Sequence, residues 1–193
     1  MRKRKISLKN TSKLRFVRKR KPNGRRIFLI RIPVVELKVS SETRRPYLKT
    51  SKVLKFRTLP DIRDSETAAA FAALFLYRDN PAEEVVFMVG MDHSHRPIAV
   101  SEVAHGTASE VILKPREIFI RAALMGAAGI LLFHNHVSGD PSPSEEDRLV
   151  TERIVKAGRI LGIELLDHVV IGQEASYSTV PFPAEGVKTK SGK

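Results

Sequence analysis

Two histidines and one aspartate could bind a metal ion in this chain: His134, His136 and, eleven residues further on, Asp147. The apolar run 129–133 in front of them predicts a buried strand, and alternate residues of a strand point the same way. Both imidazoles can therefore face one point. Imidazole and carboxylate are zinc ligands, and three protein ligands leave a fourth position open for water, as hydrolytic zinc sites require.

A helix is expected to bring the aspartate to the two histidines. The turn-forming stretch 137–143 follows His136, and Ser144 then begins a Ser-Glu-Glu-Asp pattern typical of a helix start, which puts Asp147 on the first turn. The same pair also has the form of a capping box, a purely structural role. Strand and helix together predict the metal site.

Three motifs of this region resemble the JAMM (MPN-plus, JAB-domain) metalloprotease family, in its bacterial RadC-like branch. They are residues 114–119 (KPREIF), residues 133–144 (FHNHVSGDPSPS) with Asp147, and residues 165–172 (LLDHVVIG). The resemblance runs from about Ser65 to Gly172, more than half of the chain. One departure is Val137, which stands where the family usually has Pro; it loosens the loop and removes no ligand.

The resemblance implies a fold, a cofactor and a reaction. The fold is α/β, a mixed β-sheet flanked by helices as in the MPN (cytidine-deaminase-like) fold. The cofactor is Zn²⁺ on His134, His136 and Asp147. The reaction is hydrolysis of a peptide or isopeptide bond by a metal-activated water. Ser144 is implied to stabilise the oxyanion, although it could instead only cap its helix.

A hydrolytic metal site also needs a carboxylate that is not a ligand, to take up and pass on a proton. Glu83, Glu84 and Glu102 are the candidates. In the JAMM pattern this residue begins the strand after the first helix, which favours Glu84. Glu83 is one residue out of phase and would point to the other face. Glu102, on the return strand, is the alternative base, and a solvated loop position is the alternative for Glu84.

Other polar residues could imitate a site. His93 and His95 form a second His-x-His in a predicted hairpin turn, with Val103 where the motif demands Ser, so we expect them at the surface. Asp167 and His168 lie inside the last resemblance motif. They are either a satisfied polar pair in a strand or partners that orient a metal ligand.

The order of expected elements is typical of an α/β protein. A strand broken by Pro33 and a polar loop rich in Ser, Thr and Arg precede a boundary near residue 60. The later elements are a helix from Ser65 that ends at 79–81, strands at 84–91 and 98–104, a helix at 115–128, a strand at 130–134, a helix at 144–161 and a strand at 163–171.

Charge divides the chain into two parts. Residues 1–60 hold 21 Lys and Arg against two Glu, a net charge of +19, whereas residues 61–193 carry −6. We therefore expect a basic N-terminal extension at 1–60, with a strand at 27–39, and a RadC-like JAMM/MPN domain at 61–193. Residues 1–26, with 13 Lys and Arg and no acid, suit either non-specific nucleic-acid binding or a solvated tail.

Two function classes follow. The first is a zinc-dependent hydrolase; the second is a DNA-associated accessory (repair-type) protein with a structural or vestigial metal site. The chain has no Cys, which excludes thiolate ligands and disulfides and is compatible with a reducing cytoplasm, so a cytoplasmic location is expected. No apolar stretch approaches the ~20 residues of a membrane span, so no membrane partner is expected.

Overall fold

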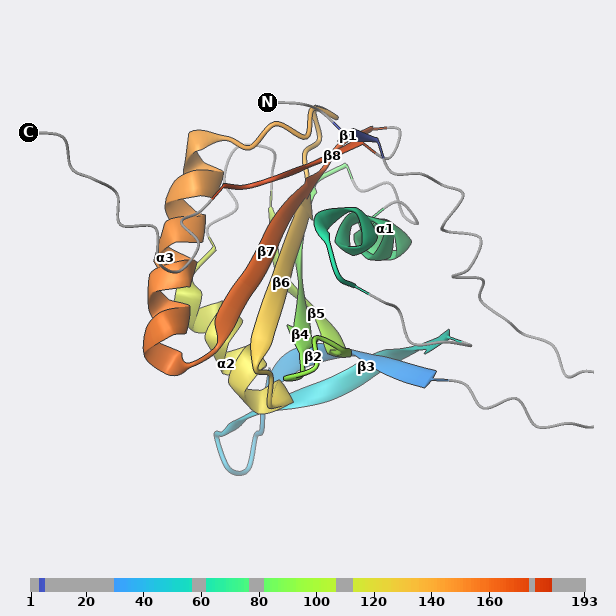
Figure 1. The fold of residues 1–193 in the computed structure, drawn as a ribbon. Helices are drawn as coiled ribbons and strands as arrows, with labels where there is room; N and C mark the ends of the chain where they lie inside the picture. The colour runs from blue at the N-terminus through green and yellow to red at the C-terminus, as the bar shows by residue number, and fades with distance from the viewer. Residues whose placement is uncertain are drawn as a thin grey trace, which may run out of the picture.

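The computed structural model describes residues 4–5, 30–56, 62–76, 82–106, 113–173 and 176–181, which form one mixed sheet with helices on both faces (Figure 1). The eight strands follow the order β1-β8-β7-β6-β4-β5-β2-β3. The elements are β1 (Arg4–Lys5), β2 (Ile30–Val39), β3 (Pro46–Phe56), α1 (Ser65–Leu76), β4 (Glu84–Met91), β5 (Pro97–Gly106), α2 (Pro115–Met125), β6 (Gly129–Asn135), α3 (Glu145–Leu161), β7 (Glu164–Ile171) and β8 (Ser176–Thr179).

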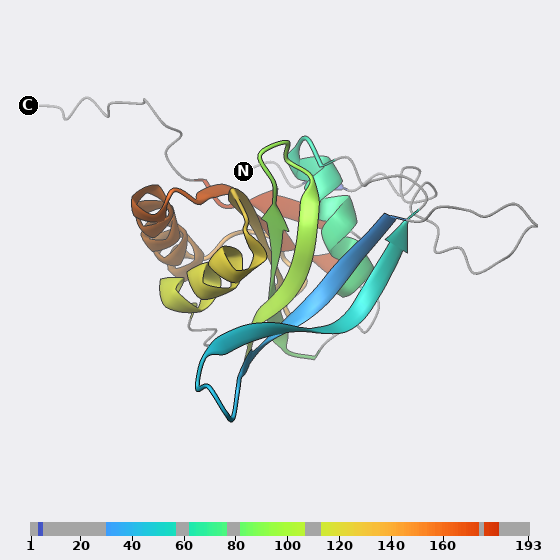
Figure 2. The same cartoon turned by 90° about the horizontal axis from the view of Figure 1, so that it is seen from below.

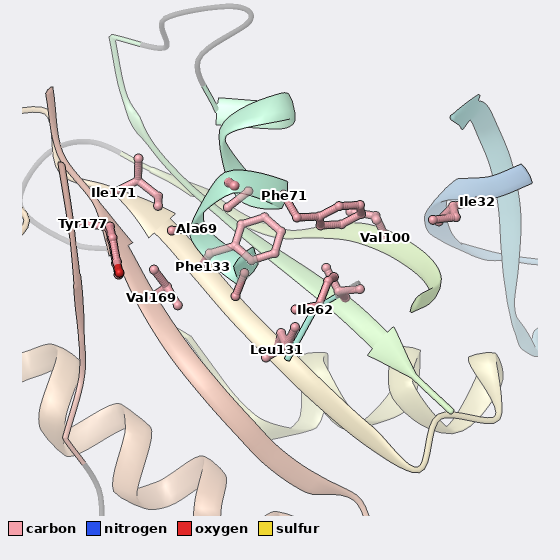
Figure 3. Close-up of a cluster of buried hydrophobic side chains, with 14 of the residues drawn as sticks. Ile32, Ile62, Ala69, Phe71, Val100, Leu131, Phe133, Val169, Ile171 and Tyr177 are labelled. Carbon is pink, nitrogen blue, oxygen red and sulfur yellow. The ribbon is translucent and has the colours of Figure 1, made fainter. Parts of the chain in front are cut away.

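The central strands separate two hydrophobic clusters. Helix α1 covers one face, where Ala69 and Phe71 pack with Phe133 and Val169 (Figure 3). Helices α2 and α3 cover the other face, and Figure 2 shows them across the sheet from α1. Strand β6 is buried on both faces, which explains its unbroken apolar sequence. Its residues alternate between the clusters, so His134 continues the side of Ile130 and Leu132, toward α3.

Helix α3 is fixed at both ends. Its N-cap is Ser144, and Gly162 closes it in the left-handed conformation, with φ 69°. Near that end, a side chain at Gly158 would collide with the carbonyl oxygen of Ile163. Glycine therefore allows α3 to lie close against the start of β7, and the N-terminal turn of α3 reaches the end of β6.

The mixed sheet flanked by helices is as expected, and so are the strands and helices from residue 84 to residue 171, whereas strand β8 was not expected. Helix α2 ends at Met125, three residues before the predicted end, because Gly126 adopts φ 68° and terminates it. Residues 77–81, where α1 was expected to end, lie outside the described residues. No described helix is both long and apolar enough to cross a membrane.

The polar loop expected after residue 39 is present at residues 40–45 only. Residues 46–56 form β3, which pairs antiparallel with β2 as a hairpin at the edge of the sheet. Most of β3 is exposed, so its sequence lacks the apolar character of an inner strand. Strand β2 covers most of the strand expected at 27–39. Both strands precede residue 60 and belong to the same sheet as the later strands, through the parallel pairing of β2 with β5.

Candidate metal centre

His134, His136 and Asp147 converge where β6 ends and α3 begins. The two imidazole Nε2 atoms lie 3.0 Å apart, His134 Nε2 lies 3.2 Å from Asp147 Oδ1, and His136 Nε2 lies 3.3 Å from Asp147 Oδ2. Ligand atoms about 2.0–2.1 Å from a tetrahedral zinc lie roughly 3.3 Å from one another, so the spacing fits such an ion. This is the group of three potential ligands that could hold a metal ion in the described part of the chain.

His136 is oriented by the loop that follows it. Its Nδ1 lies 2.8 Å from the carbonyl oxygen of Asp140, and a carbonyl can only accept a hydrogen bond. Nδ1 therefore carries a proton, and Nε2 is the ring nitrogen that faces His134 and Asp147. Burial alone would lower the pKa of His136, but the Asp147 carboxylate and the Asp140 carbonyl raise it overall.

His134 is oriented from behind by a chain of buried side chains. Thr151 Oγ1 donates to the Asp147 carbonyl at 2.5 Å, so its single proton is used and it accepts from His168 Nδ1 at 2.7 Å. Burial lowers the pKa of His168 to about 3, so the ring is neutral and its Nε2 accepts from His134 Nδ1 at 3.0 Å. With Nδ1 bonded to His168, Nε2 is the nitrogen of His134 that faces the centre.

Asp147 is held by the cap of its own helix. Its Oδ2 accepts from the Ser144 backbone N–H and from the Ser144 hydroxyl, both at 2.8 Å, while the Ser144 oxygen accepts from the Asp147 N–H at 3.0 Å. Burial would raise the pKa of Asp147, but His134 and His136 hold it well below its usual range. The capping box is therefore present, and it holds the carboxylate of the three-residue group that could hold a metal ion.

Glu84 lies in the same cleft as the three potential ligands but is not one of them. The cleft has a volume of about 570 Å³ and is lined by Glu84 beside His134, His136 and Asp147. Antiparallel pairing sets Val86 of β4 opposite His134, so Glu84 at the start of β4 lies beside the end of β6. Burial raises the pKa of this half-buried carboxyl group, against the opposing effect of the two histidines.

Asn135 holds the backbone on both sides of Glu84, and no sequence pattern pointed to this role. Its side-chain oxygen accepts from the Val85 N–H at 2.9 Å, and its amide donates to the Glu83 carbonyl at 3.1 Å. Both partners flank Glu84 in the chain. The residue between the two histidines thus holds the start of β4 against the end of β6. Thr151 was also missed; its one signal is its place four residues after Asp147, on the same face of α3.

The other polar residues that the sequence brought into question do not line the cleft. Glu83 and Glu102 are exposed and both face His105, with Glu83 Oε2 2.5 Å from Nε2 and Glu102 Oε1 3.5 Å from Nδ1. His93 and His95 are exposed in the turn after β4. Asp167 and His168 point to opposite faces: the Asp167 carboxylate accepts from Ser65 of α1 at 2.7 Å, whereas His168 contacts His134.

Comparison of the sequence with known proteins identifies a family and several relatives. Residues 62–185, well over half of the chain, match the family described as RadC-like JAB domain. A UPF0758 protein of Alkaliphilus metalliredigens is 46% identical over 88 residues, which are 46% of this chain and 38% of that protein. One from Thermotoga maritima is 40% identical over 103 residues, 53% of this chain and 45% of that protein.

A UPF0758 protein of Coprothermobacter proteolyticus is 31% identical over 144 residues, 74% of this chain and 60% of that protein. The matches thus span less than two thirds of these relatives. The chain belongs to the RadC-like JAB-domain family, and its mixed sheet with three helices is consistent with the JAB/MPN α/β fold.

Proposed function

We propose that this RadC-like JAB-domain protein is a zinc-dependent hydrolase of peptide or isopeptide bonds. The observation that carries the proposal is Glu84, a half-buried carboxyl group that lines the cleft of the three-ligand group without belonging to it. A site that only stabilised the fold would need neither a base nor an open coordination position.

The ligand set suits zinc. The imidazole nitrogens of His134 and His136 and the carboxylate of Asp147 have spacings near those of ligands in a tetrahedral zinc site. When bound, the ion supplies Lewis-acid chemistry that lowers the pKa of water toward ~7 and polarises a carbonyl group.

Glu84 is the proposed general base and then general acid. Its carboxylate takes the proton that a water molecule must lose in order to attack a carbonyl carbon, and it returns that proton to the leaving amine. The raised pKa of Glu84 helps the second step, because a carboxyl group that holds its proton more firmly is more often protonated when the amine leaves. Asn135 positions the residue through Glu83 and Val85.

Ser144 is the proposed hydrogen-bond donor to the oxyanion, and this role requires its hydroxyl group to rotate. The hydroxyl lines the cleft but donates to Asp147 Oδ2, so it must turn toward the substrate to stabilise a developing negative charge.

Two variants of Ser144 separate the oxyanion role from helix capping. Ser144→Gly keeps most of the N-cap effect while Ser144→Ala loses about 1 kcal/mol of it. Equal losses of hydrolysis support the oxyanion role, and loss in Ser144→Ala alone contradicts it.

The function is tested with the zinc-loaded full chain. Quenched fluorescent peptides and matched peptides joined through a lysine Nζ isopeptide bond are offered to the wild type and to Glu84→Gln, with zinc content measured on each sample. We expect cleavage by the wild type, abolished by a chelator and restored by zinc. A zinc-loaded wild type that cleaves neither type of bond would contradict the proposal.

The charge distribution supports a second candidate, non-specific binding of nucleic acid by residues 1–26. This segment lies outside the described residues except for Arg4 and Lys5, which form β1 beside β8. Replacing residues 18–21 (RKRK) with glutamines keeps β1 and removes four charges. The variant should bind labelled duplex DNA more weakly and with a shallower salt dependence than the wild type. Equal binding by the two proteins would exclude this tract as the nucleic-acid site.

A further inference from the structure

One wall of the cleft is a stripe of four side chains along α3. Glu146, Leu149, Val150 and Arg153 all line it, and their spacings of three and four residues place them on one face of the helix. Helix α3 begins at the three-ligand group and leads away from it. Arg153 follows Asp147 by six residues, which is roughly 9 Å along a helix axis.

Arg153 differs from the neighbouring basic residues of α3. Arg148 pairs with Glu145 at 3.8 Å, and Lys156 pairs with Glu152 at 3.6 Å. Arg153 is exposed and has no hydrogen bond or ion pair within the part of the chain that the structure describes. Within the described residues its guanidinium is thus a cation at the cleft whose donors have no partner.

Between the three-ligand group and Arg153 the cleft is apolar. Leu149, 46% exposed, and Val150 line it from α3, and Val86 and Leu113 line it from elsewhere in the fold. An exposed leucine in a cleft is a contact for an apolar side chain of a ligand. Along α3 the cleft therefore offers the metal ligands, then apolar surface, then a guanidinium.

Charge makes the two ends of this stripe unequal. Glu146 lies on the first turn of α3, next to Asp147, and disfavours a negative group close to the reacting bond. Arg153 favours a negative group at the far end. Guanidinium pairs with carboxylate through two parallel hydrogen bonds, which makes this residue selective for planar oxyanions.

We propose that Arg153 forms a subsite for a carboxylate of the substrate. An extended peptide rises about 3.3 Å per residue, so the 9 Å span sets this carboxylate roughly three residues from the cleaved bond. The carboxylate is either an Asp or Glu side chain or a free C-terminus. The distance from the cleaved bond rests on the proposed hydrolase function, whereas the binding of the carboxylate does not.

Binding of labelled peptides to the zinc-loaded full chain tests the subsite without requiring cleavage. The probes are amidated peptides of Ala and Leu with one Glu moved along the sequence, their Gln twins, and the Gln peptides with a free C-terminus. Fluorescence anisotropy is measured for the wild type, Arg153→Gln, Arg153→Lys and the matched control Lys156→Gln. The Glu peptides separate a side-chain carboxylate from a C-terminal one.

We expect one carboxylate peptide to bind the wild type and Lys156→Gln roughly tenfold more tightly than its neutral twin, a ratio worth ~1.4 kcal/mol. Arg153→Gln should bring the ratio to about one, and Arg153→Lys should restore part of it. A ratio that survives Arg153→Gln, or a wild type that prefers no carboxylate or binds none of the peptides, overturns the subsite. Arg153-dependent binding without cleavage of any peptide would leave the subsite standing and count against the hydrolase alone.

Discussion

The chain contains His-x-His twice, at His93–His95 after β4 and at His134–His136 at the end of β6. The pairing of β4 with β6 sets Met91 opposite Gly129 and Val86 opposite His134, so the two motifs lie toward opposite ends of β4. The first motif is exposed, and its turn is held by Asp92, whose Oδ1 accepts from the N–H groups of Ser94 and Arg96 at 2.8 and 2.9 Å.

The second motif is enclosed by other elements. Helix α3 contributes Asp147 as a third potential ligand, and His168 of β7 orients His134 from behind. The comparison shows that spacing alone supplies two imidazoles, whereas a metal site also needs a third ligand and partners that fix each ring. Asp147 and His168 belong to other elements, α3 and β7, and the fold brings both to the imidazoles.

The largest expected effect is loss of the metal. His136→Ala and Asp147→Asn should each abolish stoichiometric zinc binding, because the two protein ligands that remain bind zinc weakly. Asp147→Asn keeps an acceptor for the Ser144 N–H and so protects the helix cap. The double variant His93→Gln/His95→Gln should bind zinc like the wild type. Zinc content after dialysis is the measurement, and zinc that depends on His93 and His95 would reverse the comparison.

The next effect separates the base from the ligands. Glu84→Gln should keep zinc and reduce hydrolysis by about 10²–10⁴-fold, because an amide cannot take up the proton. Glu102→Gln is the matched control, since Glu102 is exposed and faces His105 instead of the cleft. The values of kcat/KM and the zinc content are measured for both variants and for the wild type. Activity that survives Glu84→Gln and is lost in Glu102→Gln would assign the base to the other strand.

A smaller effect on zinc affinity is expected for His168, which contacts the potential ligand His134. His168→Leu removes the acceptor of the His134 Nδ1 proton and should weaken zinc binding by about 10–100-fold. His168→Gln offers a side-chain oxygen in its place and should recover much of the affinity. Competition with a zinc chelator measures both, and thermal unfolding of the zinc-free proteins controls for folding. Equal affinity of His168→Leu and wild type would show that His134 needs no such partner.

The smallest effect concerns the exposed motif. His95 adopts φ 55°, a left-handed conformation that glycine tolerates better than histidine. His95→Gly should therefore raise the free energy of unfolding by less than about 1 kcal/mol and leave zinc binding unchanged. Chemical denaturation measures the change. Destabilisation, or any loss of zinc, would give His95 a role beyond the turn.

Local patterns predicted much of the fold and the convergence of three residues that could hold a metal ion. The strand of Gly129–Asn135 and the helix of Glu145–Leu161 carry strong signals, an apolar run and a capping box, and both appear close to the expected bounds. Strand β3 was missed because an exposed edge strand has no apolar pattern, and its hydrogen bonds come from β2. The contact of His168 with His134 was left open because it depends on how β7 pairs with β6.

The central claim is that one zinc ion sits on His134, His136 and Asp147. X-ray absorption at the zinc edge of the metal-loaded full chain tests it most directly, with the His93→Gln/His95→Gln protein beside the wild type. We predict the same spectrum for both proteins: nitrogen and oxygen neighbours at about 2.0–2.2 Å, with the outer-shell scattering of two imidazoles. A spectrum without imidazole scattering, or one that changes when His93 and His95 are replaced, would contradict the claim.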